Sequence, residues 1–88
     1  MSTRNYRFHI DPGHGWLEVP RADVIRSGIT PSQYSYQKDG AVYLEEDCDA
    51  SAFWQAFKRL GIAITTTEVN YNDDAPIRDY SRAAGFGV

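Results

Sequence analysis

The chain has 88 residues, 42% hydrophobic and 14% aromatic, with a formal net charge of -3 from nine basic and twelve acidic side chains. This length supports one hydrophobic core, so residues 1–88 are interpreted as a single small domain. The acidic balance disfavours nucleic acid as a direct ligand, because duplex binding needs a basic surface. The single cysteine, Cys48, excludes an internal disulfide and is typical of a cytoplasmic protein, and no apolar stretch predicts a membrane span or a signal peptide.

The first half of the chain predicts two strands and a short helix, at residues 6–10, 16–19 and 21–27. A turn-forming stretch rich in Asp, Pro and Gly joins the two strands. Pro20 cannot continue the second strand but can begin a helix. The helix is expected to turn Ala22, Ile25 and Val24 inward and to end at Gly28.

The second half predicts a hairpin, a second helix and a fifth strand, at residues 34–37 with 41–44, 50–60 and 63–69. Asp39 followed by Gly40 is a strong turn signal for the hairpin. The second helix carries an apolar stripe with the spacing of one buried face, formed by Phe53, Ala56, Phe57 and Leu60. Residues 71–88 are interpreted either as a short extra element fixed by Ile77 and Tyr80 or as a flexible tail.

The predicted order of elements is β-β-α-β-β-α-β. Because the connections are short, this order favours an antiparallel sheet of about five strands with both helices on one face. The sequence therefore predicts an α+β fold of two layers.

The densest charge feature is a run of four carboxylates within five residues, formed by Glu45, Glu46, Asp47 and Asp49. Asp49 is expected to cap the second helix, with neighbouring acids near the positive end of the helix dipole. Capping leaves the other carboxylates unexplained, so we predict a surface that binds a protein partner. Its proposed members outside the run are Trp16, Trp54, Tyr71, Asp73 and Asp74. The alternatives are that the run serves helix capping alone or binds a divalent cation through its oxygen ligands, and that the aromatic side chains simply fill the core.

A metal site is the main chemical alternative, because His9, Asp11 and His14 offer two imidazoles and a carboxylate. Asp11, however, is typical of the start of a Pro-Gly turn, and His9 alternates onto the face opposite Phe8 and is expected to be solvated. Acidic neighbours make Cys48 a poor nucleophile, since they raise a thiol pKa. We therefore expect no metal, no cofactor and no enzymatic activity.

Three segments resemble a family of short, uncharacterised bacterial proteins found on plasmids, phages and other mobile elements. They are residues 14–20 (HGWLEVP), 34–37 (YSYQ) and 42–50 (VYLEEDCDA). The resemblance covers roughly residues 14 to 57 and implies a genomic context but no catalytic residue. Small acidic proteins of such elements are often anti-defence or regulatory factors, including anti-CRISPR proteins.

The favoured hypothesis is a cytoplasmic, non-enzymatic interaction protein that binds a host or defence protein through an acidic, aromatic-rimmed surface. Homodimerisation would help so small a domain. One alternative is a small DNA-binding regulator that uses a basic patch, formed by Arg21, Arg26, Lys58 and Arg59. The other alternative is a metal-dependent enzyme that uses the two histidines and Asp11.

Overall fold

The computed structural model of the protein describes residues 2–83. Its helices and strands follow one another in the order β1 Ser2–Ile10, β2 Gly15–Pro20, α1 Arg21–Ser27, β3 Tyr36–Lys38, β4 Ala41–Glu45, α2 Asp49–Arg59, β5 Ile62–Asn70, a short 3-10 helix η1 Pro76–Asp79, and β6 Ser81–Arg82. Within the described residues, neither helix combines the length and apolar character needed to cross a bilayer.

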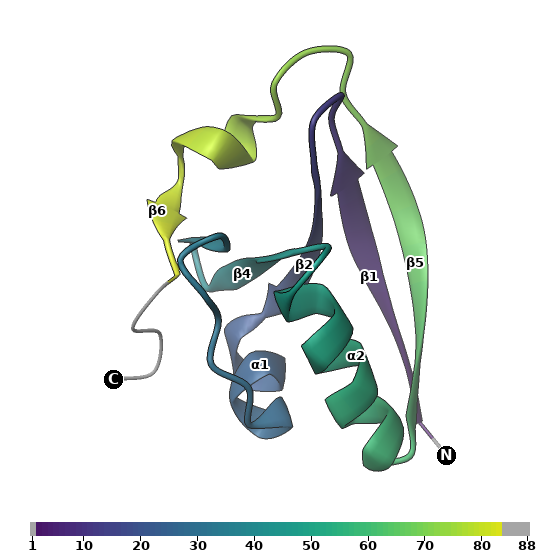
Figure 1. The fold of residues 1–88 in the computed structure, drawn as a ribbon. Coiled ribbons are helices and arrows are strands. Elements are labelled where there is room, and N and C mark those ends of the chain that lie inside the picture. Colours follow the sequence, from purple (N-terminus) through teal and green to yellow (C-terminus); the bar gives the residue numbers. More distant parts are fainter. Residues whose placement is uncertain (1, 84–88) are drawn as a thin grey trace.

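The strands form one mixed sheet in the order β5-β1-β2-β4-β3-β6. All neighbouring pairs are antiparallel except β1 and β5, which run parallel along their whole length, from Ser2 opposite Ile62 to Ile10 opposite Asn70. Their arrowheads point the same way in Figure 1. The prediction of a purely antiparallel sheet is therefore wrong, and the sheet has a sixth strand. The intervening elements end in α2, which returns the chain to the starting end of β1, as a parallel pair requires.

Both helices pack on one face of the sheet, as predicted, and the α+β two-layer fold is confirmed. Alternation along β2 and β4 turns apolar side chains toward the helices, and these meet the inner faces of α1 and α2. The core is formed by Tyr6, Leu17, Val19, Val24, Val42, Leu44, Ala50, Phe53, Phe57, Ile62 and Ala83. Two rings on neighbouring turns of α2, Phe53 and Phe57, lie 4.4 Å apart between centroids.

Three burial predictions for the helices are wrong, and one of them concerns Ala22, which is exposed. Ile25 and Leu60 were expected inside, but their exposed fractions are 58% and 51%. α1 has only two turns and buries Val24 alone. Leu60 lies beyond the last residue of α2, in the cap, so it no longer follows the apolar stripe. The predicted glycine stop is confirmed at Gly28, whose φ of 80° is left-handed backbone that glycine adopts at low cost.

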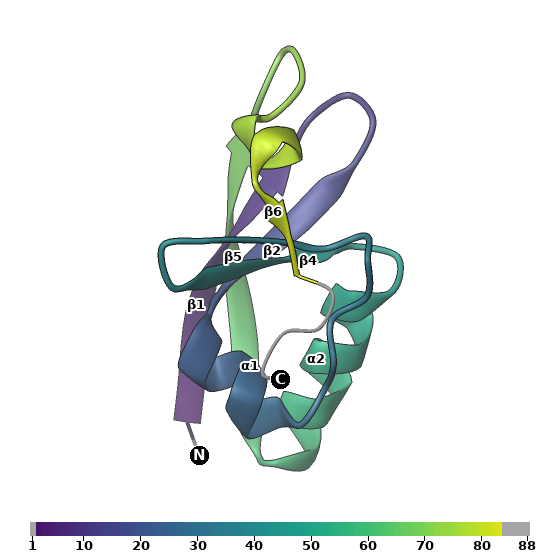
Figure 2. The same ribbon diagram turned by 90° about the vertical axis from the view of Figure 1, so that its left-hand side faces the viewer.

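The C-terminal segment crosses the opposite face of the sheet, away from the helices (Figures 1 and 2). It forms η1 and β6, and β6 pairs with β3. Its buried side chains Ala75 and Ile77 pack with Trp16 and Tyr36 into a second, smaller cluster. The prediction of an extra element fixed by Ile77 is thus confirmed, whereas residues 84–88 of the predicted tail lie outside the described residues.

Phe57→Ala tests the position of α2. The side chain is fully buried, so its removal leaves a cavity, and we expect the free energy of unfolding to fall by about 3–5 kcal/mol. Leu60→Ala is the matched control on the same helix end and should cost less than about 1 kcal/mol, because Leu60 is exposed. Denaturant unfolding of both variants decides this, and similar losses would contradict the orientation of α2.

Candidate functional site

The turn between β1 and β2 is organised by the carboxylate of Asp11. Its Oδ1 accepts hydrogen bonds from the backbone N–H groups of Gly13 and His14, both at 2.9 Å. The backbone N–H of Asp11 donates in turn to the carbonyl of His14 at 3.0 Å. The prediction that Asp11 begins a tight turn is therefore confirmed.

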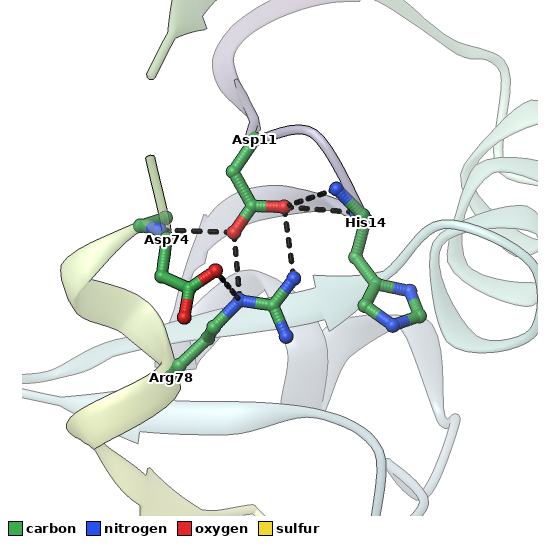
Figure 3. Close-up of polar contacts among 6 residues, drawn as sticks. Asp11, His14, Asp74 and Arg78 are labelled. Atoms are coloured by element: carbon green, nitrogen blue, oxygen red, sulfur yellow. Dashed lines mark hydrogen bonds and ion pairs between the residues drawn. The ribbon is translucent and has the colours of Figure 1, made fainter. Parts of the chain in front are cut away.

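The same carboxylate holds the C-terminal segment. Arg78 donates from Nε to Oδ2 at 2.7 Å and from Nη2 to Oδ1 at 2.9 Å, and the backbone N–H of Ala75 donates to Oδ2 at 2.9 Å (Figure 3). The side chain of Asp11 is completely buried. The Arg78 guanidinium, assisted by backbone N–H groups and opposed by burial, holds the pKa of Asp11 far below its ordinary range.

Arg78 also shapes a pocket on this side of the sheet. Its guanidinium lies over the ring of Trp16, 5.3 Å from the centroid. Arg82 lies in the same way over Tyr36 at 4.5 Å. Together they help to enclose a pocket of about 480 Å³, lined by His14, Trp16, Tyr34, Tyr36, Glu45, Asp47, Cys48, Arg78 and Arg82. We call this the Trp16 pocket.

Burial divides the acidic run into two parts. Glu45 and Asp49 are buried, with exposed fractions of 8% each, whereas Glu46 and Asp47 are exposed. The prediction that all four form a surface is therefore wrong for Glu45 and Asp49. Glu45 lies at the end of β4, and its two carboxylate oxygens accept from the backbone N–H of Asp47 at 3.0 and 2.9 Å.

Asp49 does not cap α2 as predicted. The cap position is occupied by Cys48, and no side chain makes a capping hydrogen bond there. Asp49 instead turns toward the connector before β3. Its Oδ2 accepts from the N–H and the hydroxyl of Ser32, both at 2.8 Å, and from the hydroxyl of Ser35. The hydroxyl of Ser35 accepts in turn from the backbone N–H of Glu45. Asp49 therefore ties α2 to the connector between α1 and β3.

The remaining predicted site residues lie in different places. The prediction that Trp16 lies on the surface is wrong. The C-terminal segment covers this side chain, and only 2% of it is exposed. Trp54 is 40% exposed and borders a shallow pocket together with Glu46. In the loop after β5, Asp73 is exposed, and Asp74, whose side chain is 85% exposed, forms an ion pair with Arg78 at 3.7 Å.

His9 is not solvated, contrary to prediction. Its exposed fraction is 7%, and its ring joins Glu18 Oε1 at 2.7 Å through Nε2 and the Tyr71 hydroxyl at 2.8 Å through Nδ1. Burial raises the pKa of Tyr71, with smaller contributions from Tyr80 and Glu18. Tyr71 is therefore half-buried and makes its hydrogen bond to His9, not to a residue of the acidic run.

The alternative of a metal site formed by His9, Asp11 and His14 finds no support in the structure. His9 and Asp11 are committed to the partners described above. Within residues 2–83, the one convergent group of possible metal ligands consists of His14, Glu45 and Glu46, whose nearest donor atoms all lie within 4.8 Å of one another. Sequence reasoning also missed Arg78 and Arg82, because they belong to a weakly patterned segment that reaches the site only through long-range contacts. Tyr34 was missed because it was assigned to a strand, whereas β3 begins only at Tyr36 and leaves Tyr34 exposed in the connector.

No protein-family model, curated protein or solved structure matches the chain. The resemblance of residues 14–57 to proteins of mobile elements therefore stays a prediction.

Asp49→Ala should destabilise the protein more than loss of a helix cap would. It removes the acceptor of three hydrogen bonds and leaves donors without a partner on the half-buried Ser32 and the buried Ser35, so we expect a loss of about 2–3 kcal/mol. Asp47→Ala, at an exposed position of the same acidic run, should stay within about 0.5 kcal/mol of the wild type. Equal losses in urea unfolding would rule out the buried role assigned to Asp49.

The buried Asp11 carboxylate predicts acid sensitivity. Its pKa is lower in the folded state than its ordinary value of 3.8, so its contribution to stability is present above that value and decreases as the pH falls below it. The unfolding free energy of the wild type should therefore fall more steeply between about pH 4 and pH 2 than that of Asp11→Asn. Parallel pH dependences of the two proteins would contradict this assignment.

Proposed function

We propose that the protein is a non-enzymatic interaction protein of a mobile genetic element, which binds a host or defence protein in the cytoplasm and inhibits or regulates it, as anti-CRISPR proteins do. The observation that carries the proposal is an exposed acidic pair with an exposed aromatic side chain on each side. We call Glu46, Asp47, Trp54 and Tyr34 the acidic–aromatic surface.

The charge of this surface is available to a partner. Glu46 and Asp47 are exposed, and no ion pair within residues 2–83 involves either carboxylate. Unpaired charges of one sign at an exposed surface attract an oppositely charged partner and increase the rate of association. The chemistry therefore favours a partner with a basic surface, such as the nucleic-acid-binding groove of a defence protein.

The aromatic side chains provide the apolar part of the contact. Trp54 borders a shallow pocket with Glu46, and Tyr34, 55% exposed, lines the Trp16 pocket with Asp47. Exposed Trp and Tyr side chains are among the residues that contribute most to binding at protein interfaces. Their placement on either side of the acidic pair supports a protein partner over a small substrate.

A homodimer is proposed as a second assembly. β5 is the outermost strand of the sheet, and most of its nine residues are exposed. An edge strand of this length presents unpaired N–H and C=O groups to a further strand. Sedimentation analysis over a range of concentrations tests this, because a dimer would dissociate on dilution.

The proposed partner contact is tested by a double charge reversal, Glu46→Lys with Asp47→Lys. The partner is first identified by affinity capture from host cells with the wild-type protein, and its affinity is then measured with purified components. We expect the double variant to bind at least about tenfold more weakly and with a smaller salt dependence. Trp54→Ala should weaken binding by about thirtyfold, the equivalent of about 2 kcal/mol at an interface hot spot.

The matched control is Glu68→Lys with Asp79→Lys, which changes the net charge equally at exposed positions outside the acidic–aromatic surface. It should bind as the wild type does. Equal weakening in the control would assign the effect to net charge alone. Unchanged binding by the first double variant, with its fold confirmed by circular dichroism, would refute the proposed surface.

A further inference from the structure

We propose that His14, Glu45 and Glu46 form a binding site for a divalent transition-metal ion, with Zn²⁺ as the representative ion, at the edge of the Trp16 pocket. The donor set is one imidazole and two carboxylates. Their nearest ligand atoms all lie within 4.8 Å of one another, so small rotations of the exposed His14 and Glu46 side chains would bring all three to the ligand distances of about 2.0–2.2 Å that one ion requires. This site shares Glu46 with the acidic–aromatic surface, but Zn²⁺ binding is measured on the isolated protein and does not require the proposed partner contact.

The sheet itself brings the three residues together. β2 pairs with β4 so that Trp16 lies opposite Glu45. At the next residue after β4, the backbone N–H of Glu46 donates to the carbonyl of Gly15 at 3.0 Å. His14 immediately precedes that glycine in the sequence. A side chain at position 15 would meet a Glu46 carboxylate oxygen at 2.9 Å, so glycine allows this carboxylate to lie close to the turn. The ligands are thus held by a backbone ladder.

The local charges favour a cation at this point. Within residues 2–83, neither Glu45 nor Glu46 forms an ion pair with a basic side chain. Arg78 and Arg82 line the same pocket. The charge of Arg78 is matched by Asp11 and Asp74, and the guanidinium of Arg82 lies over the ring of Tyr36 and donates to the carbonyl of Gln33. The neighbouring carboxylates of Glu45 and Glu46 repel each other. A divalent ion bound between them would remove this repulsion.

A second, separate observation indicates that the pocket takes a ligand. Only 2% of Trp16 is exposed, and its indole N–H has no hydrogen-bond partner within the described residues. Buried N–H groups are nearly always paired. Trp16 lines the same pocket as His14 and Glu45 and lies beside the His14 ring, 5.9 Å between centroids. A water or anion on the remaining coordination positions of the metal would supply the missing acceptor.

The chemistry of the donors selects the class of metal. Imidazole nitrogen together with carboxylate oxygen suits Zn²⁺ and the other divalent transition metals, whereas Mg²⁺ and Ca²⁺ prefer oxygen ligands alone. Three protein ligands also leave at least one coordination position for a ligand from the pocket. Removal of the imidazole should therefore weaken the binding of Zn²⁺ far more than that of Mg²⁺.

The test is a calorimetric titration of chelator-treated protein with Zn²⁺. The wild type should bind one equivalent, and its thermal midpoint should rise with Zn²⁺. His14→Ala and Glu46→Gln should each lower the affinity by at least about tenfold. Both side chains are exposed, so these variants should keep the wild-type fold, which circular dichroism verifies. Glu68→Gln, an exposed carboxylate on β5, is the control and should bind as the wild type does.

Two outcomes would overturn the proposal. One is the absence of stoichiometric Zn²⁺ binding by the wild type. The other is binding that His14→Ala leaves unchanged, because the acidic residues would then attract cations without forming this site. Cys48→Ser tests whether a sulfur ligand binds the metal instead, since Cys48 lines the same pocket. If Cys48→Ser binds Zn²⁺ with unchanged affinity, the result supports His14, Glu45 and Glu46 as the ligands. If this variant loses affinity for Zn²⁺, Cys48 is a ligand and the proposal is contradicted.

Discussion

One ion pair, between the buried carboxylate of Asp11 and the half-buried Arg78, holds the turn between β1 and β2 and the C-terminal segment together beside the Trp16 pocket. A buried carboxylate is costly unless every oxygen is paired, and here five N–H groups donate to it. Two of them fix the turn between β1 and β2, and three come from the C-terminal segment. The pair thus joins parts of the chain that are 67 residues apart, and it places the Arg78 guanidinium over Trp16.

The two proposals depend on this arrangement in different ways. The metal ligand His14 belongs to the turn that Asp11 organises, so its position relative to Glu45 and Glu46 follows from the ion pair and from the β2–β4 ladder. The acidic–aromatic surface lies around the beginning of α2, where Asp49 holds the helix against the connector that carries Tyr34. The buried Asp11 and Asp49 therefore provide support, whereas the exposed Glu46 and Asp47 and the pocket-lining Glu45 are available to ligands.

Local sequence signals predicted the elements of the fold but not the way in which they meet. Alternation identified β1, and the glycine stop at Gly28 was predicted correctly, because both depend on neighbours within a few residues. The parallel pairing of β1 with β5 spans 60 residues, and the contact of Asp49 with Ser32 spans 17. Nothing local distinguishes such a carboxylate from a helix cap, and the same limitation hid the proximity of His14 to Glu46.

The central claim is that the Asp11–Arg78 pair holds the C-terminal segment on the sheet. Hydrogen exchange of the Ala83 amide tests it most directly, because this N–H donates to the carbonyl of Ser35 at 2.8 Å only while the segment is docked. In Arg78→Gln, the account predicts much faster exchange at Ala83, with the amides of β1 exchanging as in the wild type. Unchanged protection at Ala83 in that variant would contradict the account.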